Sequence, residues 1–196
     1  MESTTTVKHL EDFWIRLYLG AKKDLISAVI DRAYLDFNRT QHGFLKVKTS
    51  ENYAKLKEGM VGLIAQLLES QFESQEEFDE WHECKCNYII DSYDEHTGFK
   101  VSFGQAQKWI NMSLKYLYAL GESRVPNIST NFNYFHIPID NIIQERLKSL
   151  GVKRINGSWS RLKTYEEYFT YQRTVRDRFP GRVLMDIEFE LFNQLS

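Results

Sequence analysis

Lys108 stands where an ammonium group is costly to bury. It lies in "FGQAQKWINM", and the segment "WINMSLKYLYAL" that overlaps it is apolar on nearly every face of the predicted helix. One interpretation is a lysine whose stem is buried while its ammonium group reaches water. The other is an amine kept neutral by desolvation, which makes it a nucleophile at neutral pH. The residue alone leaves both interpretations open.

Asp140 is the second residue whose type and position suit chemistry. It precedes "NIIQERLKSLGV", a pattern that predicts a short helix with Asp140 as its N-cap and Gly151 at its end. Free N–H groups and the helix dipole stabilise a carboxylate there, so the position needs no catalytic explanation. Capping and catalysis are also compatible, because the helix N-terminus keeps the carboxylate ionised.

The cysteines do not indicate a metal centre or a disulfide. The chain has two, Cys84 and Cys86, in "HECKC", which are too close in sequence for an ordinary stapling disulfide. Together with His82 they form at most half of a zinc site, and the other histidines show no paired ligand spacing. We therefore expect reduced structural thiols on a helix and no metal.

Charge is unevenly distributed along a chain whose formal net charge is only −2. Residues 69–95 contain ten acidic residues and one basic residue, Lys85, whereas residues 144–182 contain ten basic and four acidic residues. Phosphate contacts require a local basic face, which a nearly neutral chain can still carry. The alternative is that both segments are ordinary solvated helix faces, and charge alone does not separate the two.

Helical periodicity dominates the 196 residues, which fit a single domain, 1–196. We expect two helices joined near Gly20, a helix starting at a Ser50 cap whose Gly59 and Gly62 pack closely against a neighbour, and a helix opened by the capping box of Ser74 and Glu77. The Lys108 helix should end at Gly121.

Further along the chain, the Asp140 helix should be followed by one opened by a capping box of Thr164 and Glu167. A last helix is expected over "VLMDIEFELFNQL". Only "GFLKVK" and "GFKVSF" are candidate strands. The prediction is an all-α domain of about eight helices. No secretory leader and no apolar run near twenty residues is visible, so we expect a cytoplasmic protein without a membrane span.

Two segments in the right order resemble a known family. "GQAQKWIN" is similar to the Gly-x-Gly-x-Lys-Thr-Ala-Asn segment of helix-hairpin-helix DNA glycosylases with lyase activity, and "HIPIDNIIQERLKSLGV" is similar to their second segment, in which an aspartate opens a helix. The interval of 32 residues from Lys108 to Asp140 looks like the archaeal 8-oxoguanine DNA glycosylase branch. The closing "VLMDIEFELFN" resembles the last helix of that branch. The match covers roughly residues 100–195.

The resemblance implies a compact all-α fold with two helical lobes, approximately 1–100 and 101–196, and an active site between them. It implies that Lys108 and Asp140 are catalytic and that Asp186 faces the base pocket. Met112 and Glu190 stand where that branch has residues that stack on the flipped base, so an oxidised guanine is not favoured over another damaged or modified base. Pro138 is also displaced, because Ile139 separates it from the aspartate.

Other side chains near the two segments are candidates for substrate binding. Gln107 directly precedes the lysine, and the loop "NFNYFHIP" offers Phe135 and His136 as stacking or wedge residues, although core packing explains these rings equally well. Trp159, between Arg154 and Arg161, is the best candidate for an exposed aromatic residue near a phosphate.

The sequence therefore predicts a DNA glycosylase with associated lyase activity, acting on double-stranded DNA that carries a damaged or modified base. The chemistry would need a flipped nucleotide, attack by Lys108 on the anomeric carbon and assistance from Asp140, and it would need neither a metal nor an organic cofactor. Two alternatives stay open. One is a non-catalytic protein of the same fold that binds DNA or a modified base. The other is a helical interaction module, for instance in phage defence, that acts through the acidic segment 69–95.

Overall fold

The computed structural model describes residues 6–20, 24–38 and 51–193, and within these ranges every regular element is helical. The prediction of an all-α domain with about eight helices is confirmed for this part of the chain. "GFKVSF" contains no strand, because Ser102 caps a helix that begins at Phe103. Ser50 and "GFLKVK" lie outside the described residues.

The elements are α1 (Val7–Leu19), α2 (Leu25–Asn38), α3 (Glu51–Glu69), α4 (Gln75–Thr97), α5 (Phe103–Leu120), the 3-10 helix η2 (Phe132–Tyr134), α6 (Asn141–Ser149), the 3-10 helix η3 (Trp159–Arg161), α7 (Tyr165–Arg178) and α8 (Leu184–Asn193).

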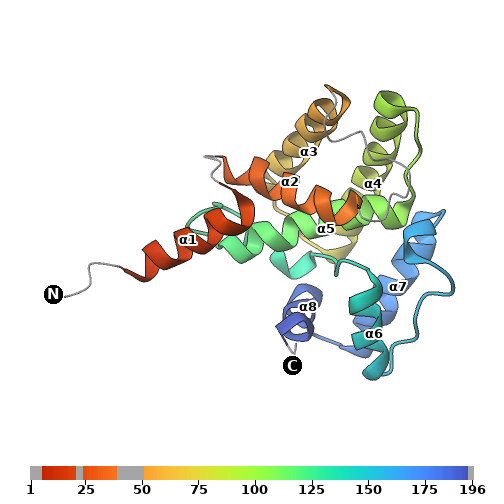
Figure 1. Cartoon of the computed structure of the whole chain (residues 1–196). Coiled ribbons are helices and arrows are strands. Elements are labelled where there is room, and N and C mark those ends of the chain that lie inside the picture. Colours follow the sequence, from red (N-terminus) through yellow and green to blue (C-terminus); the bar gives the residue numbers. More distant parts are fainter. Residues whose placement is uncertain (1–5, 21–23, 39–50, 194–196) are drawn as a thin grey trace.

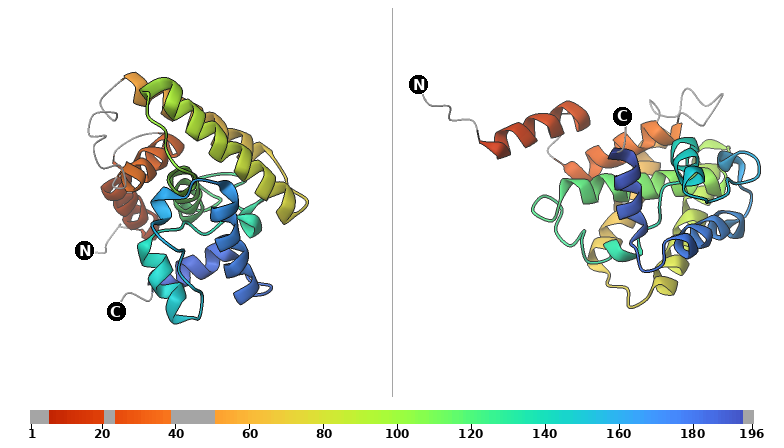
Figure 2. Two further views of the ribbon diagram at one scale, coloured as in Figure 1. Left: turned by 90° about the vertical axis from the view of Figure 1, so that its right-hand side faces the viewer. Right: turned by 90° about the horizontal axis from the view of Figure 1, so that it is seen from below.

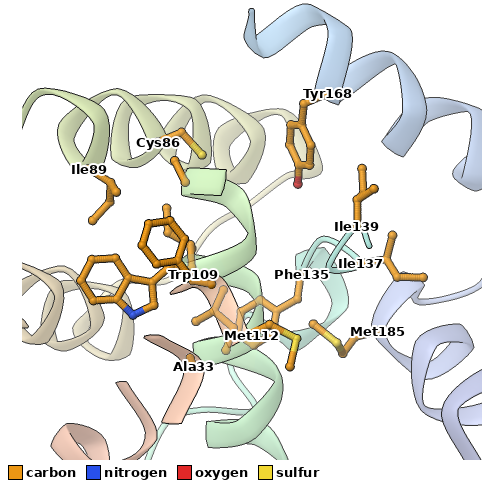
Figure 3. Packing of buried hydrophobic residues seen from close by; sticks show 14 of the residues in the cluster. Ala33, Cys86, Ile89, Trp109, Met112, Phe135, Ile137, Ile139, Tyr168 and Met185 are labelled. Atoms are coloured by element: carbon orange, nitrogen blue, oxygen red, sulfur yellow. The ribbon is translucent and has the colours of Figure 1, made fainter. Parts of the chain in front are cut away.

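The central element is α5, with α2, α3 and α4 on one side of it and α6, α7 and α8 on the other (Figure 1). Its contact with α2 is made by Trp109, whose indole N–H donates to the carbonyl of Ile30 at 3.2 Å and whose ring stacks on Phe37. Figure 3 shows Trp109 in one apolar cluster with Met112 and Phe135. Burial of large aromatic groups such as these supplies much of the stabilisation of a small domain.

The first helix is attached differently from the others. α1 projects from the rest of the chain in the right-hand view of Figure 2. It has no fully buried residue. Arg124 pairs with both Glu11 and Asp12, and Ile15 and Leu19 pack against the core. Five other large apolar side chains stay exposed: Val7, Leu10, Phe13, Trp14 and Leu17. None of the described helices is both long enough and apolar enough to cross a membrane.

Local signals for helix ends are mostly confirmed. The capping box of Thr164 and Glu167 is present, and α5 begins with a further capping box between Ser102 and Gln105. Ser74 caps α4, but the Glu77 carboxylate accepts the backbone N–H of Glu73 instead of that of Ser74, so only half of that box forms.

The two glycines predicted to pack closely in α3 differ. A methyl group at Gly59 would overlap the Tyr88 hydroxyl, as expected, whereas Gly62 has no neighbour within 4 Å of that position. Cys84 and Cys86 are free thiols on α4, as predicted.

A buried polar network connects α4 to α7 around His136, which is fully buried. His136 Nε2 lies 2.6 Å from Asp79 Oδ1, so this nitrogen carries the proton, and Nδ1 accepts the Tyr168 hydroxyl at 2.7 Å. Arg176 donates hydrogen bonds from both of its terminal nitrogens to the Asp79 carboxylate. His82 continues the network by bonding to Asn111. His136, a candidate for base stacking, is therefore part of the core.

Acid should destabilise the protein through this network. Burial lowers the pKa of His136 to about 4, against the opposing effect of Asp79, whereas an unfolded histidine titrates near about 6.5. Between these values the unfolded chain binds a proton that the folded chain does not, so stability is complete above about pH 6.5 and decreases as the pH falls towards 4. Burial also lowers the pKa of His82, which acts in the same direction.

Urea unfolding between about pH 7 and pH 4.5 tests this expectation. His136→Gln should reduce both the stability at neutral pH and its dependence on pH across this range. The same slope in the wild-type protein and in the variant would contradict the assignment of the neutral His136.

Candidate catalytic site around Lys108 and Asp140

The structure brings Lys108 and Asp140 into direct contact. Lys108 Nζ lies 2.6 Å from Asp140 Oδ2, and the exposed fractions of the two side chains are 6% and 27%. Lys108 therefore does not reach freely into water, and Asp140 is the more accessible member of the pair. The 31 residues between them form the remainder of α5, the loop that follows it, η2 and the segment that ends at the start of α6.

Asp140 is also the N-cap of α6, as predicted. Its Oδ1 accepts the backbone N–H of Ile143 at 2.8 Å while Oδ2 faces Lys108. Burial raises the pKa of Asp140, but the charge and the hydrogen bond of Lys108 and the backbone N–H groups outweigh it, so the pKa is lower than usual. The two oxygens of one carboxylate thus fix a helix start and hold an ammonium group.

Two glutamines hold the extended segment that leads to Asp140. Gln107 on α5 accepts the N–H of Ile139 at 3.3 Å and donates to its C=O at 3.1 Å. Gln172 on α7 does the same for Ile137, at 3.3 and 2.8 Å. Pro138 lies between them and has no N–H to satisfy. Buried backbone groups need partners, and the two side-chain amides provide them where no strand is present.

A second buried ion pair lies on the same face of α5. Lys115 follows Lys108 by seven residues, which is two helical turns, and its Nζ lies 2.6 Å from Glu188 Oε1 on α8. The same ammonium group lies 4.3 Å from the centre of the Phe192 ring. Sequence reasoning missed Glu188, although its position on the buried stripe of Leu184, Ile187 and Leu191 was a visible signal.

The remaining predicted site residues are distributed between core and surface. Gln107 is fully buried and hydrogen-bonds to the backbone of Ile139. Phe135 is buried in the core. Asp186 is exposed on the first turn of α8, and Glu190 is exposed and paired with Arg182.

The prediction that Trp159 is exposed is wrong. It is buried because η3 packs against the start of α5, where a side chain at Gly104 would overlap the Trp159 carbonyl oxygen.

A small cavity lies beside Asp140, between α5, α6 and α8. It is lined by Met112, Lys115, Asp140, Ile142, Ile143, Arg146, Glu188 and Phe192. Its volume is about 50 Å³, whereas one molecule of liquid water occupies about 30 Å³. Met112 lines this cavity, whereas Asp186 and Glu190 do not.

The described residues contain no group of three or more histidine, cysteine, aspartate or glutamate side chains placed to hold a metal ion.

No protein-family model matches the chain, and no curated protein or solved structure matches it at a significant level. The resemblance to the glycosylases therefore depends on the motif residues themselves.

Replacing Gln107 by leucine should destabilise the protein. The substitution leaves the N–H and C=O of Ile139 buried without partners, at a cost of about 1–3 kcal/mol for each group. The measurement is urea unfolding, with Gln71→Leu as the matched control, since Gln71 is exposed and its replacement should change stability by less than about 0.5 kcal/mol. Equal effects of the two substitutions would contradict the role of Gln107 in holding the segment.

Replacing Glu188 by leucine should destabilise the protein by about 3–5 kcal/mol, because it leaves the Lys115 ammonium group buried without its carboxylate. In the double variant Lys115→Met with Glu188→Leu, most of that loss should be recovered, since no unpaired charge remains. Thermal and urea unfolding of the two single variants and the double variant measure the coupling. Additive effects would show that the two side chains do not stabilise each other.

Proposed function

We propose that the protein is a DNA glycosylase with associated lyase activity, in which Lys108 is the nucleophile and Asp140 its proton acceptor. The observation that carries the proposal is the contact of 2.6 Å between a buried amine and a helix-capping carboxylate, at the two positions where the glycosylase segments have their catalytic pair. Two helical lobes, approximately 1–100 and 101–196, would contact the DNA on either side of this pair.

The reaction begins when the target nucleotide leaves the base stack, since the anomeric carbon is inaccessible inside a duplex. Asp140 accepts a proton from the Lys108 ammonium group, and the neutral amine forms a bond to C1′ while the glycosidic bond breaks. The base leaves with the electron pair of that bond and takes up a proton. Opening of the sugar ring, with O4′ protonated, then yields an imine between Lys108 and C1′.

Strand cleavage follows from the same intermediate. The imine acidifies the proton on the adjacent C2′, and its removal expels the phosphate on the 3′ side. Water then hydrolyses the imine and releases Lys108. When the proton held by Asp140 passes to the departing base, the restored carboxylate also stabilises the positive charge that develops on the sugar. One amine and one carboxylate therefore suffice for both activities.

The geometry around the pair adds a requirement for substrate entry. The cavity next to Asp140 is small, and Phe192 near the end of α8 lines part of it. The proposal therefore requires α8 to move away from α5 and α6 before a flipped base enters. Arg146 lines the cavity and would meet a phosphate next to the flipped nucleotide.

The basic segment 144–182 supports DNA as the partner. Part of its charge is used within the protein: Arg154, Arg173, Arg176 and Arg182 all pair with carboxylates. Within the described ranges no carboxylate pairs with the remaining cations of the segment, which are Arg146, Lys148, Lys153, Arg161, Lys163 and Arg178. Unpaired surface cations are what the phosphates of a duplex require.

Borohydride trapping on duplex DNA with an abasic site tests the proposal. The wild-type protein should form a covalent adduct, Lys108→Gln should form none, and Asp140→Asn should form it at least about 100-fold more slowly. Lys55→Gln removes an exposed lysine on α3 and should behave like the wild-type protein. Peptide mapping should locate the reduced adduct on Lys108 and not on Lys115.

Three results would overturn the proposal in different ways. An adduct on Lys115 would move the chemistry to the second ion pair. Salt-sensitive DNA binding without an adduct, over a panel of damaged and modified bases, would indicate a non-catalytic binding protein. Absence of DNA binding at low salt would favour an interaction module, and the exposed apolar side chains of α1 would then be a more suitable contact surface than the acidic segment 69–95.

A further inference from the structure

A second, much larger hollow lies away from the Lys108–Asp140 pair. It is an open groove of about 810 Å³ between the segment 151–156, which follows α6, and the first three turns of α7. None of its lining residues lines the small cavity beside Asp140. Its volume is in the range of about 300–1,000 Å³ that small-molecule sites occupy.

The apolar part of the groove contains an unsatisfied hydroxyl group. Ile155, Leu162 and Tyr171 form this apolar part, and Tyr171 is only 5% exposed. The Tyr171 hydroxyl is buried without a hydrogen-bond partner, which is uncommon because a buried polar group without a partner costs free energy. Burial raises the pKa of Tyr171 to about 12, and the charge that acts against this increase is that of Arg154, another lining residue.

The charges available to a ligand in this groove are positive. The Glu166 carboxylate is occupied by Arg173 and the Thr170 hydroxyl. The Glu167 carboxylate accepts the backbone N–H groups of Lys163 and Thr164 in the capping box of α7.

Two cations line the groove, and one of them is paired with a carboxylate. Lys153 is exposed and has no ion-pair partner within the described ranges. Arg154 lies beside it and pairs with Glu145 at the edge of the groove. The ligand that complements this rim is an anion.

The position of the groove connects it to the candidate catalytic site. Arg154 also approaches Asn141, the residue directly after Asp140, with 3.5 Å between Nη2 and Oδ1. Leu162 is joined to the start of α5, because its carbonyl accepts the N–H of Phe103 at 3.1 Å. Arg154 therefore lies between the groove and the residue that follows Asp140.

We propose that this groove binds a phosphorylated nucleoside. Its base lies on Leu162 and Ile155, and an acceptor atom of the base accepts a hydrogen bond from the Tyr171 hydroxyl. Its phosphate lies between Lys153 and Arg154. The nucleoside comes either from a free nucleotide or from an unpaired nucleotide of a DNA strand. The second source rests on the proposed glycosylase function, whereas the first does not.

Calorimetric titration with deoxyadenosine monophosphate and fluorescence anisotropy with a short labelled single strand test the two sources. Tyr171→Phe removes only the hydroxyl group, so the free protein should be as stable as the wild-type protein or slightly more stable. Affinity should nevertheless decrease about tenfold in Tyr171→Phe and in Lys153→Gln. Tyr88→Phe, at an exposed tyrosine on α4, should leave the affinity unchanged.

Each outcome has a separate meaning. Binding of the mononucleotide that depends on Tyr171 supports a site for free nucleotides, and dependence seen only with the single strand supports a site for an unpaired nucleotide of DNA. No binding of either probe, or equal affinity in the wild-type protein and in Tyr171→Phe, would overturn the proposal. Mononucleotide binding does not depend on the glycosylase chemistry, so a failure of borohydride trapping would overturn the glycosylase proposal without affecting this site.

Discussion

The position of Asp140 depends on the way the chain satisfies the backbone of residues 137–139. This segment crosses the core in extended form between α5 and α7, where no strand offers hydrogen bonds. Gln107 and Gln172 replace the hydrogen bonds that a neighbouring strand would make. The side-chain amide of Gln107 provides one donor and one acceptor to the backbone of Ile139, and that of Gln172 does so for Ile137. Because Gln107 precedes Lys108 on α5, the amide that fixes the end of the segment and the amine that meets Asp140 come from neighbouring residues.

Two lysines on α5 are buried, and an ion pair offsets the free-energy cost of burying each charge. Lys108 and Lys115 lie two turns apart, and carboxylates from different helices reach them: Asp140 from α6 and Glu188 from α8. Such pairs add little net stability compared with apolar residues, but they strongly disfavour any arrangement in which one partner is missing. The two pairs therefore specify how α6 and α8 dock on α5. The pair at Asp140 is the more exposed to solvent, which makes it the better candidate for chemistry.

The candidate aromatic residues lie in the core, so their place in the structure differs from what their positions in the sequence suggest. Phe135, His136 and Trp159 are core residues, so contacts with a nucleic acid would be made by cations of the segment 144–182 and by the groove beside α7. Arg176 is withdrawn from that surface because it neutralises Asp79 in the buried network. A count of basic residues overestimates the basic surface for this reason.

The sequence by itself determined the helical class, most helix ends, the free thiols of α4 and the position of Asp140 at the start of a helix. These features depend on interactions over at most four residues, such as the Asp140 cap, or on a periodicity that a single helix displays. The tertiary structure alone decided which carboxylate meets which lysine, and that Glu188 rather than Asp186 faces α5. It also decided that Gln107 and His136 satisfy buried partners and that Trp159 is covered by α5. Those outcomes depend on groups separated by 32 to 73 residues, and local propensity contains no information about such contacts.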